Sequence, residues 1–205
     1  ILSEYLDNNE KKVESSYVSR LFPNKDIFYK GKVHEQIDST LPRTNISVCV
    51  NHYGYYENDK TDRNLPLLKE ELKESPNDAY ILYQIGKQYF LKQNYNSANK
   101  YFLSSYRIID INEYYKSKLV VDYLYSLIRA GTLEDGVSII EKEKKYLDNS
   151  TDFHFVCGIF FMELVFSNVN KYISYYPNIE QEYLKCLEIG DIEKQDSVIG
   201  TGSFL

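Results

Sequence analysis

The spacing of hydrophobic positions changes along the chain after Asp59. Before that point, β-branched and aromatic residues stand in short runs between turn residues, a pattern typical of strands. The predicted strands are Tyr17–Phe22, Ile27–His34 and Ile46–His52. Residues 1–16 carry Leu2, Tyr5 and Leu6 at helical spacing, which predicts one short helix followed by a loop.

Apolar residues recur at helical spacing from Asp62 onward, which predicts a series of helices. Asp62 or Asn64 can cap the first of them, with Pro66 in its first turn. The turn Ser75–Asp78 ends that helix, and Asp78 can cap the next one.

The next two predicted helices carry small and large residues at fixed spacing. The positions are Leu82, Ile85, Gly86 and Tyr89 on one helix, and Ala98 and Phe102 on the other. This spacing resembles the tetratricopeptide repeat, a helical hairpin in which small residues let two helices approach closely. Asn94 and Tyr95 mark the turn, and Asp110 stands where the repeat pattern has its final proline.

Two further hairpins are predicted from the same pattern. In the weaker second one, Gly136 takes the place of Ala98 and Leu124 that of Gly86, with Ala130–Gly131 as the turn. The third hairpin pairs the helix Phe153–Phe166, with Gly158 at the close-contact position, with a helix that carries Ile179, Tyr183 and Cys186. A long turn over Tyr172–Pro177 joins the two helices, and the second helix ends at Gly190. The expected fold class is mainly α, a tetratricopeptide-like α-solenoid preceded by a few β-strands.

Composition and charge argue against several classes of function. A formal charge of −6 and a pI near 5.2 argue against nucleic acid or an anionic membrane as the main partner. Three widely spaced cysteines without a C-x-x-C pair favour a reducing cytoplasm. The most apolar run, Phe153–Phe166, contains His154 and Glu163 and is shorter than the ~20 residues that span a bilayer, so we expect a buried helix and no membrane span. The chain begins at Ile1 rather than Met, and we expect it to be a fragment.

Few residues suggest chemistry. His34 beside Glu35 offers a nitrogen ligand and a carboxylate, which a divalent metal or a proton transfer requires. The alternative is a solvated strand end, which the local pattern alone favours. No phosphate-binding glycine loop, nucleophile elbow or zinc spacing occurs in the sequence.

A longer series of motifs favours a chemical role for His34 and Glu35 over a solvated strand end. In order, these are Arg20–Phe22, Tyr29–Glu35, Asn51–Tyr55, and Arg63–Asn64 with Leu67–Leu68. The series resembles the end of a bacterial glycosyltransferase family 2 catalytic domain, and is most similar to the sublancin-type peptide S-glycosyltransferase branch, in which that domain runs into tetratricopeptide helices. The resemblance implies a C-terminal remnant of a GT-A type α/β domain over residues 1–58 and a helical repeat domain over residues 59–205.

The resemblance also implies chemistry for the full-length enzyme: transfer of a sugar from a nucleotide-diphosphate sugar to a peptide or protein, with manganese or magnesium held by a DxD motif. By position, His34 would contact the metal, Glu35 would be the catalytic carboxylate, and Arg20 and His52 would bind substrate. No DxD occurs in the right context, and the nucleotide-binding strands are absent. We therefore expect this fragment alone to bind no cofactor and to be inactive.

The sequence is compatible with two interpretations, a fragment of a glycosyltransferase and a non-enzymatic tetratricopeptide module for protein interaction. Both assign peptide binding to the helices. With Gly86 as the eighth position of its repeat, the groove positions are Tyr80, Tyr83, Lys87 and Phe90, then Lys118, Val121, Tyr125 and Arg129. Such a groove would select an extended peptide with acidic and apolar side chains. The alternative is that these side chains are buried.

Overall fold

The computed structural model describes residues 2–6, 12–17, 21–23, 26–31, 33, 36–37, 39, 41–42, 44–52 and 61–190. The chain divides into two compact units, and the boundary falls between Leu67 and Leu68, inside the first helix. Over the described residues the protein is mainly helical, as the sequence predicts.

The N-terminal unit contains two small sheets. The strands β1 (Leu2–Leu6), β2 (Lys12–Tyr17) and β5 (Cys49–His52) form one sheet in the order β2-β1-β5, and β3 (Tyr29–Lys30) pairs with β4 (Gln36–Ile37) in the other. In the first sheet β1 is antiparallel to β2 and parallel to β5.

The predicted helix within residues 1–16 is wrong, because β1 and β2 occupy this stretch. The stripe of Leu2, Tyr5 and Leu6 was too short to be stable as an isolated helix, whereas in the sheet β1 has a hydrogen-bonded neighbour on each side. β5 and β3 lie within two of the predicted strands. The remaining predicted strand, Tyr17–Phe22, begins at the last residue of β2. Its residues 18–20 lie outside the described ones, and Leu21 and Phe22 are not in a strand.

The helices follow in chain order. They are α1 (Thr61–Glu74), α2 (Ala79–Leu91), α3 (Tyr95–Ile108), α4 (Lys116–Ala130), α5 (Glu134–Leu147), α6 (Thr151–Ser167), α7 (Val169–Tyr172), the 3-10 helix η1 (Ile173–Tyr175) and α8 (Tyr176–Ile189). The long turn predicted over Tyr172–Pro177 is wrong, since α7, η1 and the start of α8 fill that stretch.

Local sequence explains most helix ends. The Asp78 carboxylate accepts hydrogen bonds from the amides of Tyr80 and Ile81, which confirms the predicted cap of α2. Gly190 ends α8 with φ of +75°, a conformation that glycine adopts without steric cost. The predicted start of α1 is corrected: the helix begins at Thr61, so neither Asp62 nor Asn64 precedes it as a cap.

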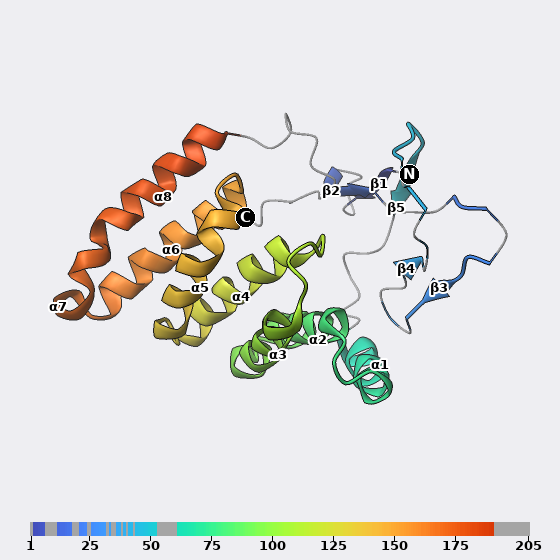
Figure 1. The fold of residues 1–205 in the computed structure, drawn as a ribbon, viewed down its shortest axis with the longest axis horizontal. Helices are drawn as coiled ribbons and strands as arrows, with labels where there is room; N and C mark the ends of the chain where they lie inside the picture. The colour runs from blue at the N-terminus through green and yellow to red at the C-terminus, as the bar shows by residue number, and fades with distance from the viewer. Residues whose placement is uncertain are drawn as a thin grey trace. The chain divides into compact units, whose positions relative to one another are not determined.

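In the second unit, whose helices Figure 1 shows, three glycines lie where neighbouring helices pack against each other. A Cβ on Gly86 of α2 would lie 2.5 Å from the Phe102 ring of α3, and one on Gly158 of α6 would lie 2.8 Å from the Tyr183 ring of α8. In both hairpins an aromatic ring therefore occupies the space that a side chain would need. Gly136 of α5 meets the Phe160 ring of α6 in the same way.

The core of this unit runs through the stacked helices. α4 contacts α3 on one side and α6 on the other. Its Leu124 and Leu127 are almost fully buried, and Tyr123 lies against Phe102 with ring centroids 6.1 Å apart. The predicted burial of the apolar run on α6 is also confirmed, with Phe153, Phe160 and seven other α6 residues buried.

Candidate functional site

Three tyrosines join the start of α2 to the start of α4. The Tyr115 ring stacks on Tyr83 with centroids 5.5 Å apart and an angle of 15° between planes, and Tyr80 meets the same ring edge-on at 5.1 Å. Tyr115 directly precedes the first residue of α4. The tyrosine contacts therefore fix the spacing between two successive first helices of the predicted hairpins.

The structure corrects the predicted groove at Tyr83. Its side chain is only 2% exposed, and its hydroxyl donates a hydrogen bond of 2.7 Å to the Asp122 carboxylate of α4. Burial, and then the negative charge of Asp122, raise the pKa of Tyr83 well above 10. Tyr83 is a core residue that joins α2 to α4, and its ring is not accessible to a peptide.

The other predicted groove residues keep part of their surface. Tyr80, Lys87 and Tyr125 are half-buried, and Arg129 is exposed in the last turn of α4. The Lys87 Nζ lies 5.5 Å from the centroid of the Tyr83 ring, so its ammonium group covers the outer side of that buried aromatic residue. These side chains come from neighbouring helices and combine aromatic surface with positive charge.

Acidic groups also lie close to this face. Burial, and then the charge of Asp152 on α6, raise the pKa of Tyr125 to about 12, so the phenol is neutral at physiological pH. Asp122 already accepts the Tyr83 hydroxyl. The face is therefore less basic than the sequence alone indicates.

α6 contributes a residue that the sequence analysis did not name. Phe155 is 43% exposed, and its ring meets Tyr183 edge-on with centroids 6.0 Å apart. If Gly158 is aligned with Gly86, Phe155 takes the position of Tyr83. The pattern that placed the first groove residues could therefore have identified it. We call the surface formed by Tyr80, Lys87, Tyr125, Arg129 and Phe155 the first-helix face.

The candidate catalytic residues are not brought together in the part of the chain that the structure describes. Arg20, His34 and Glu35 lie outside the described residues, and His52 ends β5 with its side chain also outside them. Within the described residues, no group of three or more His, Cys, Asp or Glu side chains could hold a metal ion. The catalytic and metal assignments thus remain predictions.

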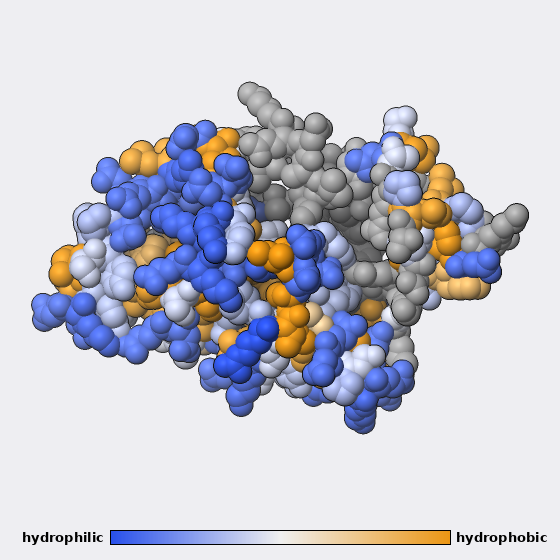
Figure 2. Space-filling model, viewed as in Figure 1, coloured by the Kyte–Doolittle hydropathy of each residue, from blue (hydrophilic) through white to orange (hydrophobic). Residues whose placement is uncertain are grey.

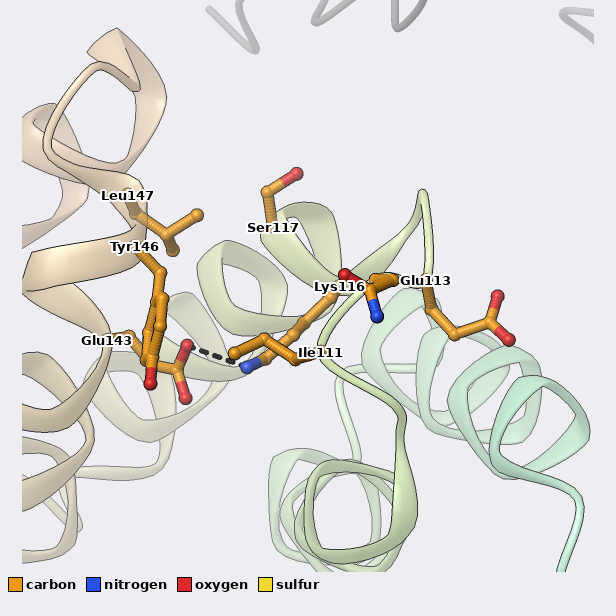
Figure 3. Close-up of a pocket in the computed structure, with 8 residues that line it drawn as sticks. Ile111, Glu113, Lys116, Ser117, Glu143, Tyr146 and Leu147 are labelled. Atoms are coloured by element: carbon orange, nitrogen blue, oxygen red, sulfur yellow. Dashed lines mark ion pairs between the residues drawn. The ribbon is translucent and has the colours of Figure 1, made fainter.

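A pocket of about 450 Å³ lies where the loop between α3 and α4 meets the end of α5 (Figure 3). Its lining residues are Ile111, Asn112, Glu113, Lys116, Ser117, Glu143, Tyr146 and Leu147. In Figure 2 a hydrophobic patch covers the same region, where Ile108 and Ile111 are 45% and 48% exposed. Because these residues are far apart in sequence, no local pattern could have predicted the pocket.

An ion pair forms one wall of the pocket. The Lys116 Nζ lies 3.0 Å from Oε2 of Glu143, without the geometry of a hydrogen bond, and Tyr106 donates a 2.7 Å hydrogen bond to Oε1. Glu143 is 1% exposed. The pair fixes α4 and α5 together, and neither group is available as an acid or base without breaking it.

A second buried network joins α5, α6 and α8. The His154 Nδ1 lies 2.5 Å from Oε2 of Glu182, its Nε2 lies 3.0 Å from the Asp148 carbonyl oxygen, and Lys144 donates to Oε1 of Glu182 at 2.7 Å. Both ring nitrogens therefore have an oxygen neighbour, which holds the imidazole between the end of α5 and α8. Cys157 lies nearby with its pKa raised by burial, which makes it a neutral thiol rather than a nucleophile. The arrangement is structural.

Comparisons with family models and with curated proteins assign the chain to no family. No protein-family model matches the chain, and a search of the curated proteins found no match. Of the helices in the described ranges, none combines the length and the apolar character that crossing a bilayer requires.

Proposed function

We propose that the helices α2 to α8 form a tetratricopeptide-like solenoid that binds an extended peptide or protein segment on the first-helix face. The observation that carries this proposal is the set of partly exposed aromatic and basic side chains on successive first helices. Tyr80 and Lys87 come from α2, Tyr125 and Arg129 from α4, and Phe155 from α6. Such rings offer contact area at a small cost in side-chain entropy.

The recurring glycine contact supports the repeat arrangement. Gly86 with Phe102 and Gly158 with Tyr183 are the same kind of approach, each between the two helices of one hairpin. α4 lies between these hairpins and contacts both α3 and α6. Stacked hairpins of this kind present their first helices side by side, which gives a continuous surface for a long ligand.

The charges on the face indicate the ligand class. Lys87 and Arg129 favour acidic side chains, and the rings of Tyr125 and Phe155 favour apolar ones. The preferred ligand is therefore a segment that alternates acidic with apolar residues.

We also propose a context for this binding, the acceptor step of a family 2 glycosyltransferase. The ordered motifs from Arg20 to Leu68 support it, and in the full-length enzyme the helices would hold the acceptor peptide while a nucleotide-diphosphate sugar and a divalent metal are bound by the catalytic domain. A reducing cytoplasm suits the three cysteines, which form no disulfide. The alternative proposal is a module that binds protein without chemistry. Calorimetry of the chain with nucleotide-diphosphate sugar and manganese tests the expectation that this fragment alone is inactive, and micromolar binding would contradict that expectation.

Peptide binding is tested by fluorescence anisotropy. The probe is a labelled peptide of repeated Glu-Leu-Asp-Phe units, and a peptide of repeated Lys-Leu-Arg-Phe units is its control. We expect the acidic peptide to bind more tightly, and Lys87→Glu and Tyr125→Ala each to weaken it about tenfold. Lys100→Glu, a matched charge reversal at an exposed position on α3, should leave binding unchanged. Equal effects of Lys87→Glu and Lys100→Glu would refute the assignment of the face.

A further inference from the structure

α8 carries an exposed apolar stripe on the side away from its own hairpin. Tyr176, Leu184 and Leu187 are 60%, 56% and 78% exposed, and the exposed Glu180 lies between them at spacings of four, four and three residues. Residues at this spacing share one side of a helix. In Figure 2 hydrophobic residues are visible near both ends of α8, with hydrophilic residues between them.

The equivalent side of α3 shows what covers such a stripe. Because Gly158 meets Tyr183 as Gly86 meets Phe102, the residues Leu184 and Leu187 correspond to Leu103 and Tyr106 of α3. Both of these α3 side chains pack against the core, and the Tyr106 hydroxyl bonds Glu143 of the next hairpin. The position of Glu180 corresponds to Asn99, whose amide donates to Thr132 in the turn between α4 and α5.

We propose that the α8 stripe, formed by Tyr176, Glu180, Leu184 and Leu187, docks an amphipathic helix of a partner protein, in the place that the following hairpin takes on α3. Apolar residues of the partner helix, spaced by three and four, would cover the tyrosine and the two leucines. A basic side chain in the middle of that apolar side would pair with Glu180. This surface lies on a second helix of a hairpin and is separate from the first-helix face.

Glu180 decides against a second copy of this chain as the occupant. Two α8 helices packed through this stripe, parallel or antiparallel, would bring their Glu180 carboxylates within about one helical turn of each other inside an apolar contact. Like charges placed together in that way oppose association. In the described part of the chain Glu180 has no ion-pair partner, so its charge is available to a basic group.

The test uses the full chain and two synthetic helical peptides. Both carry leucines at spacings of three and four, and they differ only in a lysine or a glutamate at the centre of the leucine side. We expect the wild-type chain to bind the lysine peptide about tenfold more tightly, and Glu180→Lys to reverse that order. Leu187→Ala should weaken both complexes, whereas Glu141→Lys, at an exposed position on α5, should change neither.

Three results would overturn the proposal. One is an unchanged peptide preference in Glu180→Lys, and another is peptide binding that Leu187→Ala does not affect. The third is self-association of the wild-type chain in sedimentation equilibrium that Leu187→Ala abolishes, because a second copy would then be the occupant. All three substituted positions are exposed, so the variants should fold as the wild type does.

Discussion

Adding one methyl group at Gly86 tests the close contact between α2 and α3. The new Cβ would lie 2.5 Å from Cδ1 of Phe102, whereas ordinary contacts of this kind begin at 3.4 Å. The buried Phe102 ring must therefore move by roughly 1 Å within a packed core. Overpacking of this kind costs about 1–3 kcal/mol of unfolding free energy.

Phe102→Leu supplies the matched background for this prediction. With the ring removed, Gly86→Ala loses its clash and keeps the benefit of alanine over glycine inside a helix, about 0.5–1 kcal/mol. Gly86→Ala should therefore destabilise the wild-type chain and be neutral or stabilising in the Phe102→Leu chain. A change of sign in the effect of Gly86→Ala would come from the contact with Phe102, because helix propensity acts equally in both backgrounds.

Urea denaturation followed by circular dichroism at the helical band measures both backgrounds. In the wild-type background the melting temperature should also fall, by about 2–4 °C for each kcal/mol in a chain of this size. The reasoning is refuted if Gly86→Ala changes the unfolding free energy by the same amount in both backgrounds, because the two sites would then be uncoupled.

Three further results are expected from the buried polar groups. Tyr83→Phe should cost about 1–3 kcal/mol in urea denaturation, since it leaves the Asp122 carboxylate without its donor. The pKa values of Tyr83 and Tyr125 are raised above the value of about 10 in an unfolded chain, so their contribution to stability should be constant below pH 10 and should be lost as the pH rises toward 12; a melting temperature that rises over that range would contradict this. Glu182→Ala should cost about 3–5 kcal/mol because it leaves the His154 side chain buried without its carboxylate, and a loss below 1 kcal/mol would show that the network contributes little.

Helices of this chain could be predicted from local signals. Asp78 and Gly190 are a cap and a stop that act within a few residues, and both predictions are confirmed. Small residues at fixed spacing also located the close contacts of Gly86 and Gly158. Each of these features depends on residues within one hairpin, which is the distance over which sequence patterns are informative.

Features that depend on distant residues could not be predicted in this way. β1 pairs with β5 across more than forty residues, and nothing in the local sequence of Leu2–Leu6 specifies that partner. The burial of Tyr83 depends on Asp122 and Tyr115, which belong to the next hairpin. A groove position deduced from one predicted hairpin is therefore a contact between α2 and α4 in the structure.

Peptide binding on the first-helix face is the central property proposed for this protein. Hydrogen–deuterium exchange of the full chain, with and without the peptide of Glu-Leu-Asp-Phe units, tests it most directly. We predict slower amide exchange in α2, α4 and α6 when the peptide is bound, and unchanged exchange in α3, α5 and α8. Protection confined to α8, or to the pocket between the α3–α4 loop and α5, would contradict the claim.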